Sequence, residues 1–347
     1  MSSQNEKKKM NKAVKAIIII ISVILGLALA AGATALIMYN VGKNSLKNTP
    51  PEDVVITTPD DLEDVVIEQD GATVYYNGEK YEFNENAVPI LLLGADKYSF
   101  EDNEGIGYNG QADAVYLAVL NTETKAVSVL AISRDSMVDV NKYSHQGGYL
   151  GTEKMQLCLA YAYGDGKEKS CENVAVSVSR LLYNVPISSY MAIDFEAIPV
   201  LNDAVGGVTV PEYTDDGMTP TGGTVTLNGQ QAMRYLRWRW MPELTSNNAR
   251  IERQKSYISA FAKIAVQKTK ENISFPLTLY NSVQDYMVTN ISASQITYLA
   301  ANYLSGVENM KLYSIPGTIE KVDGYAQFTP DSTVLYETIL ELFYTKK

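Results

Sequence analysis

Arginine is concentrated in one stretch of this chain. Of the seven arginines in 347 residues, five lie between Arg234 and Gln254, in RYLRWRWMPELTSNNARIERQ, whereas lysine supplies most positive charge elsewhere. The planar guanidinium group can donate two parallel hydrogen bonds to phosphate oxygens, while lysine acts as a hydrated point charge. The cluster therefore indicates an oxyanion site; a solvated face of ion-paired side chains is the alternative.

Three aspartates adjoin apolar runs that predict strands. These aspartates are Asp96, Asp113 and Asp135, and the runs are Val88–Leu93, Ala114–Leu120 and Ala126–Ile132. Ligand sites in sheets with flanking helices gather at strand ends, so these carboxylates could hold Mg²⁺ or Mn²⁺ against a phosphate. Turn formation is the alternative role for aspartates in such places.

Two other patterns argue against common enzyme classes. His145 is the only histidine, which excludes a zinc site built on several histidines and disfavours a hydrolase triad, so we expect an exposed loop residue. The run Gly105–Gly110 (GIGYNG) matches a dinucleotide fingerprint, but it lies ten residues past a predicted strand and leads into another strand. It therefore predicts a glycine-rich loop and no nucleotide site.

Cys158 and Cys171 are the only cysteines. Two neighbouring antiparallel helices could bring them within bonding distance in an oxidising compartment. Two buried free thiols are the alternative, and the sequence leaves both open.

The chain that must position these residues has a charge asymmetry. Its formal net charge is −11, but six of its 29 basic residues and one of its 40 acidic residues lie in residues 1–43, which leaves −16 on the remainder. An acidic body argues against sequence-independent nucleic-acid binding, because that affinity comes from basic contacts to phosphate. Any anion must bind in a local pocket.

The N-terminus predicts a membrane anchor. Ala16–Met38 is a run of 23 residues without a charge, which is long enough to cross the hydrocarbon core as a helix. Five lysines precede it, so the N-terminus is expected on the cytoplasmic side. We expect a cytoplasmic tail over 1–15, a single-pass anchor over 16–39 in the cell membrane, and an extracytoplasmic linker over 40–70. A cleaved signal peptide is the alternative.

The rest of the chain predicts an α/β body. A small β-hairpin is expected over 71–87, turning at Asn77-Gly78, before a catalytic domain over 88–347. Interleaved strands and helices indicate a three-layer α/β/α sandwich with a central mixed β-sheet. The helices are predicted at Glu153–Tyr163, Cys171–Tyr183, Leu201–Val205, a short helix capped by Asn228, Ile251–Lys268, Ser292–Tyr303 and Ser332–Tyr344. Further strands are predicted at Tyr190–Phe195 and Lys311–Ile315.

Several phrases of the sequence resemble one family in their order. They are LLLGADK, GQADAVYLAVLN, SVLAISRDSMV, KMQLCLAYAYGDG, FEAIPVLNDAVGGVTV, LNGQQAMRYLRWR, ARIERQK and SIPGTIEKVDGYAQFTPD. Over about Val88 to Phe343 the chain resembles the LytR-CpsA-Psr family of bacterial cell-wall proteins. The resemblance implies an α/β/α fold with a long hydrophobic pocket for a polyprenyl chain.

The resemblance also implies a reaction. Family members transfer a glycopolymer, such as a teichoic acid or capsular polysaccharide, from an undecaprenyl-pyrophosphate carrier to peptidoglycan with the aid of Mg²⁺. Such phosphoryl transfer depends on positioning and charge neutralisation more than on covalent help from the protein. A non-catalytic binder of the lipid carrier or envelope regulator, and a hydrolase of the same donor, are the alternatives.

Family roles can be carried over by position. Asp96 and Asp113 match the metal-binding aspartates, and Asp96, Asp113, Arg134 and Arg250 match the catalytic set. The residues expected to grip the pyrophosphate are Arg134, Lys154, Arg237, Arg239, Arg250, Arg253 and Gln254. An extended backbone would point Arg237 and Arg239 to one side and Trp238 and Trp240 to the other. For the two tryptophans, packing in the core is favoured over contact with sugar or lipid. Arg234 matches no family motif and is expected at the surface.

The chain departs from the family pattern at a few positions. Tyr98 and Gln111 stand where arginines are usual, so two charge-assisted contacts to phosphate are expected to be missing. The other departures are Ser133 in place of proline, Asn247-Asn248 in place of an aspartate, and Gln156 in place of asparagine.

Overall fold

The computed structural model describes residues 37–45, 57–59, 62, 65–68, 72–238 and 246–347. Most of the predicted anchor, and the cytoplasmic tail, lie outside these residues. Within them, no helix is both long and apolar enough to cross a membrane. Residues 37–45 form a helix that packs on a later helix through Tyr39, whose hydroxyl donates to Asn302 Oδ1 at 3.2 Å.

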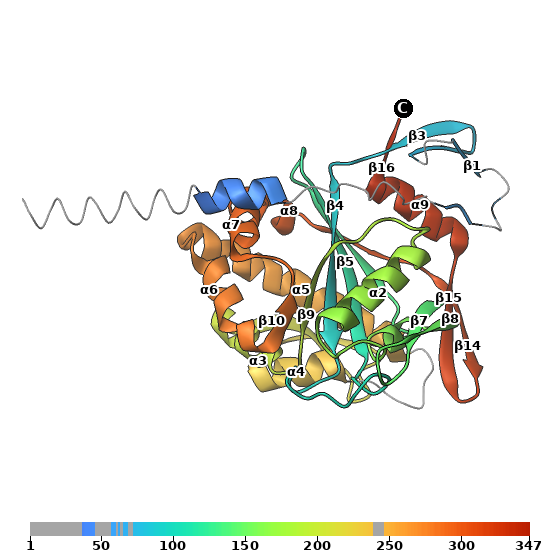
Figure 1. Ribbon diagram of the computed structural model, residues 1–347. Helices are drawn as coiled ribbons and strands as arrows, with labels where there is room; N and C mark the ends of the chain where they lie inside the picture. The colour runs from blue at the N-terminus through green and yellow to red at the C-terminus, as the bar shows by residue number, and fades with distance from the viewer. Residues whose placement is uncertain (1–36, 46–56, 60–61, 63–64, 69–71, 239–245) are drawn as a thin grey trace, which may run out of the picture.

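A six-stranded mixed sheet forms the centre of the molecule (Figure 1). Its strands, in spatial order, are β12 (Met287–Thr289), β9 (Ser189–Ile193), β4 (Ala87–Ala95), β5 (Ala112–Asn121), β6 (Val127–Ile132) and β13 (Lys311–Ser314). β4 pairs antiparallel with β5 and parallel with β9, and β6 pairs parallel with β13. The predicted mixed α/β fold with a central mixed sheet is confirmed.

Helices cover both faces of the sheet, because β4 and β5 are apolar on both sides. On one face the core joins the sheet to α2 (Glu168–Leu181) and α9 (Ser332–Phe343). On the other it joins the sheet to α5 (Ser246–Glu271) and α7 (Ala293–Asn302). The remaining helices are α3 (Ala197–Val205), α4 (Gly229–Arg237), α6 (Phe275–Ser282), α8 (Leu304–Glu308), η1 (Leu157–Ala160) and η2 (Gln284–Tyr286).

The predicted N-terminal hairpin is present and belongs to a second, smaller sheet. β2 (Thr73–Tyr76) and β3 (Glu79–Phe83) turn at Asn77 and Gly78, both with positive φ as this turn requires. β1 (Val65–Ile67), from the predicted linker, and β16 (Tyr344–Lys346), at the C-terminus, complete this sheet. Because β16 pairs with β3, the C-terminal end of the body lies in the same small sheet as the N-terminal hairpin.

Three further hairpins were not predicted: β7–β8 (Met137–Tyr143, Tyr149–Gln156), β10–β11 (Val208–Tyr213, Pro220–Leu227) and β14–β15 (Gly317–Val322, Tyr325–Pro330). The helix predicted at Glu153–Tyr163 is wrong, since its first half is β8 and only η1 is helical. Pairing with β7 overrides local helical preference there.

Of the two possibilities left open for the cysteines, the structure has the free thiols. Cys158 lies in η1 and Cys171 in α2, and both thiols are free and buried. The Cys158 Sγ faces Arg134, whose Nη2 lies 3.1 Å away. Burial raises the pKa of both thiols, so neither is an activated nucleophile.

Candidate functional site

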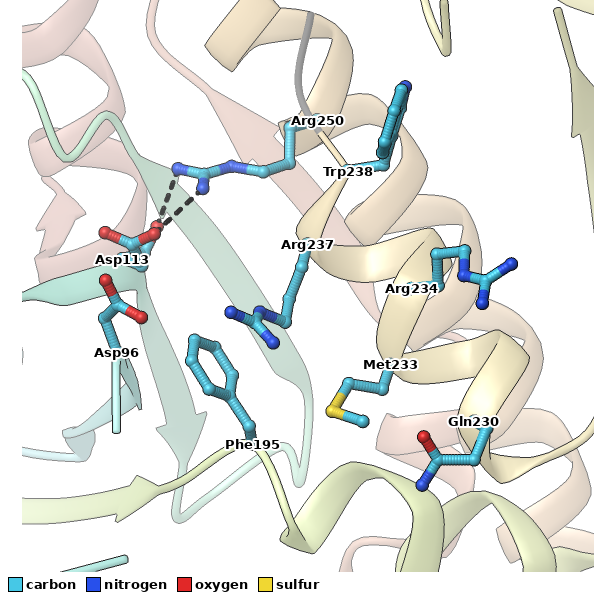
Figure 2. Close-up of a pocket in the computed structure, with 9 residues that line it drawn as sticks. All are labelled: Asp96, Asp113, Phe195, Gln230, Met233, Arg234, Arg237, Trp238 and Arg250. Atoms are coloured by element: carbon cyan, nitrogen blue, oxygen red, sulfur yellow. Dashed lines mark hydrogen bonds and ion pairs between the residues drawn. The ribbon is translucent and has the colours of Figure 1, made fainter. Parts of the chain in front are cut away.

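The two predicted metal-binding aspartates lie side by side because of antiparallel pairing. Gly94 pairs with Ala114 and Ala95 with Ala112, so Asp113 is the extra residue of a β-bulge. Bulges next to active sites redirect a side chain. Asp96 follows the last residue of β4, and its amide donates to Gln111 O at 2.8 Å. Both carboxylates consequently face one cleft (Figure 2).

Arg134 lies opposite Asp113, two residues beyond the end of β6. β5 and β6 are antiparallel and Val115 pairs with Ile132, so Asp113, two residues before Val115, lies beside Arg134, two residues after Ile132. The two side chains form a close ion pair, and Arg134 Nη2 also donates to Gln111 Oε1. Gln111, where the family usually has arginine, therefore orients an arginine that the chain retains.

Arg250 reaches the same carboxylate from the first turns of α5. Its Nη1 lies 3.1 Å from Asp113 Oδ2, and its Nη2 donates to Asp113 O at 3.0 Å and to Asn247 Oδ1 at 2.8 Å. Asn247, one of the departures, also donates to Ser133 Oγ at 3.3 Å, so two departures contact each other. Asp113 is thus held between two arginines at the floor of the cleft.

One face of α4 forms a wall of the cleft. The helix starts at a capping box in which Asn228 and Gln231 each accept from the other's amide at 2.9 Å, as expected. Gln230, Met233, Arg234 and Arg237, spaced i, i+3, i+4 and i+7, line the cleft together with Phe195, Trp238, Arg250 and the two aspartates. The cleft has a volume of about 490 Å³.

The backbone that carries Arg237 is helical, whereas an extended backbone was expected. Figure 2 shows Arg237 and Arg250 directed toward the aspartates, whereas Arg234 points away, as expected of a surface side chain. Trp238 is 44% exposed and lines the cleft, so its predicted core packing is wrong. Arg239 and Trp240 lie outside the described residues.

Tyr98, which stands where the family usually has arginine, contacts Arg237. Its hydroxyl accepts a hydrogen bond from Arg237 Nη1 at 3.0 Å, and the Arg237 guanidinium lies 3.4 Å from the centre of the Phe195 ring. Each residue that replaces a family arginine therefore contacts an arginine: Tyr98 contacts Arg237 of the cleft lining, and Gln111 contacts Arg134, which pairs with Asp113.

Replacing Tyr98 with phenylalanine should loosen Arg237 while leaving the ring in place. The KM for an anionic donor is expected to rise about fivefold to tenfold, since one hydrogen bond to a charged group is worth about 1–1.5 kcal/mol at a partly exposed site. Steady-state kinetics would measure it, with Tyr325→Phe, an exposed tyrosine on β15, as the control. Equal KM values in both variants would show that the hydroxyl does not position Arg237.

Arg253 and Gln254 do not face the cleft, contrary to the expected pyrophosphate contact. Arg253 is 2% exposed, and its three guanidinium nitrogens donate to the carbonyls of Tyr235, Gly217 and Trp238. Gln254 donates to Leu236 O at 3.1 Å and accepts from Tyr116. Arg253 and Gln254 therefore bond α5 to the C-terminal end of α4, and these bonds hold the backbone of Arg237 in place.

The other predicted residues lie away from the cleft lining. Asp135 is buried, 3.5 Å from Arg134 Nε, and accepts from Gln156 at 3.3 Å, so it supports Arg134 from behind. Lys154 is exposed on β8, opposite Asp139 in the register. The sequence missed Phe195, Gln230 and Met233; the helical spacing after Asn228 was the signal that could have found the latter two.

An apolar cavity of about 410 Å³ adjoins the cleft. It lies between β4, β5 and β9 and the helices α3, α4 and α5, with walls that include Leu92, Ile198, Leu236, Tyr257, Ile258 and Phe261. Asp113, Phe195, Arg237 and Arg250 line both spaces. The cleft, which is lined by arginines and by two aspartates, is therefore continuous with a cavity whose walls are apolar.

Asp194 places a carboxyl group in the wall of this apolar cavity. It is 1% exposed; Oδ1 accepts from the amides of Glu196 and Ala197 at 3.0 and 3.1 Å, while Oδ2 has no hydrogen-bond partner among the described residues. Burial raises its pKa from 3.8 to about 6, against the opposing effect of the two amides.

This pKa predicts a pH-dependent contribution to stability. Between about pH 4 and pH 6 the folded protein retains a proton at Asp194 that the unfolded chain has lost, so the free energy of unfolding should fall as pH rises through this window. Denaturant unfolding of wild type and Asp194→Asn should show a difference that changes between pH 4 and 6 and is constant above pH 7. A difference independent of pH would contradict the raised pKa.

The donor set at the cleft fits a hard divalent cation. The exposed Asp96 carboxylate has no hydrogen bond or ion pair among the described residues and points into the cleft beside Asp113. No group of three histidine, cysteine or acidic side chains in the described part of the chain could hold a metal alone. Mg²⁺ is commonly bound by one or two carboxylates together with substrate phosphates, so two aspartates suffice.

Known proteins resemble this chain in sequence and fold. TagU of Enterococcus faecalis, named a polyisoprenyl-teichoic acid--peptidoglycan teichoic acid transferase, is 26% identical over 75% of this chain and 80% of its own. The TagU of Bacillus anthracis (strain CDC 684 / NRRL 3495), with the same name, is 29% identical over 74% and 78%. The crystal structure of protein gbs0355 from Streptococcus agalactiae aligns with a TM-score of 0.61 at 24% identity, covering 74% and 86%. A model of the LytR_cpsA_psr family matches residues 62–342, and the chain belongs to that family.

Proposed function

We propose that this chain is a membrane-anchored phosphotransferase that moves a glycopolymer from an undecaprenyl-pyrophosphate carrier to a hydroxyl of peptidoglycan. The observation that carries the proposal is the junction of the arginine-lined cleft with the apolar cavity, through four shared residues. A pyrophosphate with a hydrocarbon tail has this same division between anionic head and apolar chain. The names of the TagU relatives supply the glycopolymer and the acceptor.

In the proposed reaction, the acceptor hydroxyl attacks the phosphorus proximal to the sugar. A new P–O bond to peptidoglycan forms, the bridging P–O bond breaks, polyprenyl monophosphate leaves and the hydroxyl proton passes to solvent. Arg237 and Arg250 would hold the non-bridging oxygens, and Arg134 would keep Asp113 in place. Mg²⁺, held by Asp96 and Asp113, would neutralise the negative charge that builds on the phosphates.

The test uses the full-length protein with a synthetic polyprenyl-pyrophosphate-linked sugar and peptidoglycan oligomers, with a related active enzyme run in parallel. Mg²⁺-dependent appearance of a sugar–phosphate–peptidoglycan product, identified by mass spectrometry, is the expected result. No linked product would refute the transfer. Donor cleavage without acceptor would identify a hydrolase, and lipid retention without any cleavage would identify a binder.

The Asp96→Asn variant should separate the metal role from the fold. It is expected to need at least about tenfold more Mg²⁺ for half-maximal transfer, since it replaces a charged ligand with a neutral one. Asp323→Asn is the matched control, because Asp323 is an exposed turn residue of the β14–β15 hairpin. The same Mg²⁺ requirement in both variants would remove Asp96 from the metal site.

A further inference from the structure

The glycine-rich loop and the single histidine meet at the protein surface. Tyr108, within Gly105–Gly110, stacks on His145 with ring planes 6° apart and centres 5.7 Å apart. His145 belongs to the turn of the β7–β8 hairpin, where Tyr143 and Tyr149 pack with ring centres 5.7 Å apart. Two segments distant in sequence therefore combine into one aromatic surface.

This surface is exposed, although aromatic side chains usually gain from burial. Tyr108 is 62% and Tyr149 60% exposed, and His145 is exposed as well. Beside the rings, the Tyr149 hydroxyl and Thr152 Oγ1 lie 2.8 Å apart, and Thr152 donates to Asn141 Oδ1 at 3.1 Å. We call Tyr108, His145 and Tyr149, with this polar edge, the aromatic platform.

The loop that presents Tyr108 is firmly held. The buried Asn109 side chain donates to Gly164 O at 2.9 Å and accepts from the Glu104 amide at 3.0 Å, and the Gly107 amide donates to Ala162 O at 2.7 Å. The Lys97 ammonium, which is also buried, donates to Asp102 O. Positive φ at Gly105, Gly107 and Gly110 permits this tight path. Tyr108 is therefore preorganised, which lowers the entropic cost of binding a ligand.

The same loop connects the platform to the cleft. It runs from Asp96 to Asp113, and Gln111 within it contacts Arg134. Tyr108 precedes Asp113 by five residues, so their Cα atoms lie within about 18 Å of each other at full extension. A sugar chain whose hydroxyl reaches the cleft could therefore extend over the platform.

The chemistry of the platform suits a glycan. The axial C–H bonds of a pyranose form an apolar, slightly positive face that packs on the negative face of an aromatic ring, while hydroxyl and acetamido groups bond to neighbouring polar side chains. The surrounding charge disfavours a polyanion: the loop carries Asp102 and Glu104, Lys142 is paired with Glu153 at 2.6 Å, and Lys154 stands opposite Asp139.

We propose that the aromatic platform is the docking surface for the glycan strand of the peptidoglycan acceptor, a β-1,4-linked chain of N-acetylated hexosamines. This rests on the proposed transfer. The strand lies across Tyr108 and His145 and presents its hydroxyl to the cleft, while the lipid-linked donor approaches from the apolar cavity. The platform thereby separates acceptor from donor.

The test measures binding of a β-1,4-linked N-acetylglucosamine tetramer to the full-length protein by NMR titration. Tyr108→Ala should weaken binding about tenfold, which corresponds to 1.4 kcal/mol, whereas Tyr108→Phe and the control Tyr325→Ala should bind as wild type. In the transfer assay, Tyr108→Ala should raise the KM for acceptor without changing kcat or the KM for donor.

Unchanged tetramer affinity in Tyr108→Ala would overturn the proposal, as would stronger Tyr108-dependent binding of a poly(glycerol phosphate) oligomer. If the tetramer bound in a Tyr108-dependent way but the protein transferred no glycopolymer, the docking surface would be supported and the proposed transfer refuted. Transfer with an unchanged acceptor KM in Tyr108→Ala would refute the platform alone.

Discussion

Replacing Arg250 with alanine is expected to lower kcat/KM for transfer by roughly 10²–10³-fold, the usual cost of losing one preorganised donor to a developing oxyanion. Arg250 is 3% exposed, contacts both the carboxylate and the carbonyl of Asp113, and lines both the cleft and the apolar cavity. It therefore lies at the junction of the cleft and the apolar cavity, where the pyrophosphate would meet the lipid in the proposed reaction.

The Arg250 experiment needs a control for charge and one for folding. Arg250→Lys keeps the charge but not the planar fork, so it should recover only part of the lost activity. Arg180→Ala, on α2 with one bond to Asp139 O, should be as active as wild type. An Arg250→Ala enzyme that unfolds like wild type and keeps activity within threefold would exclude Arg250 from catalysis.

Arg253 is expected to govern stability, because its guanidinium satisfies three backbone carbonyls in the interior. Arg253→Met preserves much of the apolar volume but leaves those carbonyls without a donor, and each buried unsatisfied group costs about 1–3 kcal/mol. We expect the free energy of unfolding to fall by about 3–5 kcal/mol in denaturant titrations, with activity lost as Arg237 shifts.

Arg253→Lys should recover part of that stability, since lysine can satisfy one or two of the carbonyls. If Arg253→Met were as stable as wild type and only donor binding failed, Arg253 would be a phosphate ligand after all. The Arg180→Ala variant supplies the baseline, because its single contact is exposed and worth little.

The sequence by itself indicated several of the residues that the structure brings together in one cleft. Arginine clustering pointed to an oxyanion site, apolar runs located β4, β5 and β6, and the aspartates at their ends proved to be neighbours. These features were predictable because strand periodicity and helix capping are local, as the Asn228 capping box illustrates. The ordered motifs also indicated the family.

Only the tertiary structure decided what each arginine does. Arg250 and Arg253 are three residues apart on one helix, yet one meets a carboxylate in the cleft and the other meets backbone carbonyls in the interior. Likewise, Tyr98 and Gln111 were predicted as losses, whereas they hold Arg237 and Arg134. The arginine that contacts Gln111 is 23 residues away in the sequence, and the one that contacts Tyr98 is 139 residues away. Local sequence carries no information on which distant groups the fold brings together.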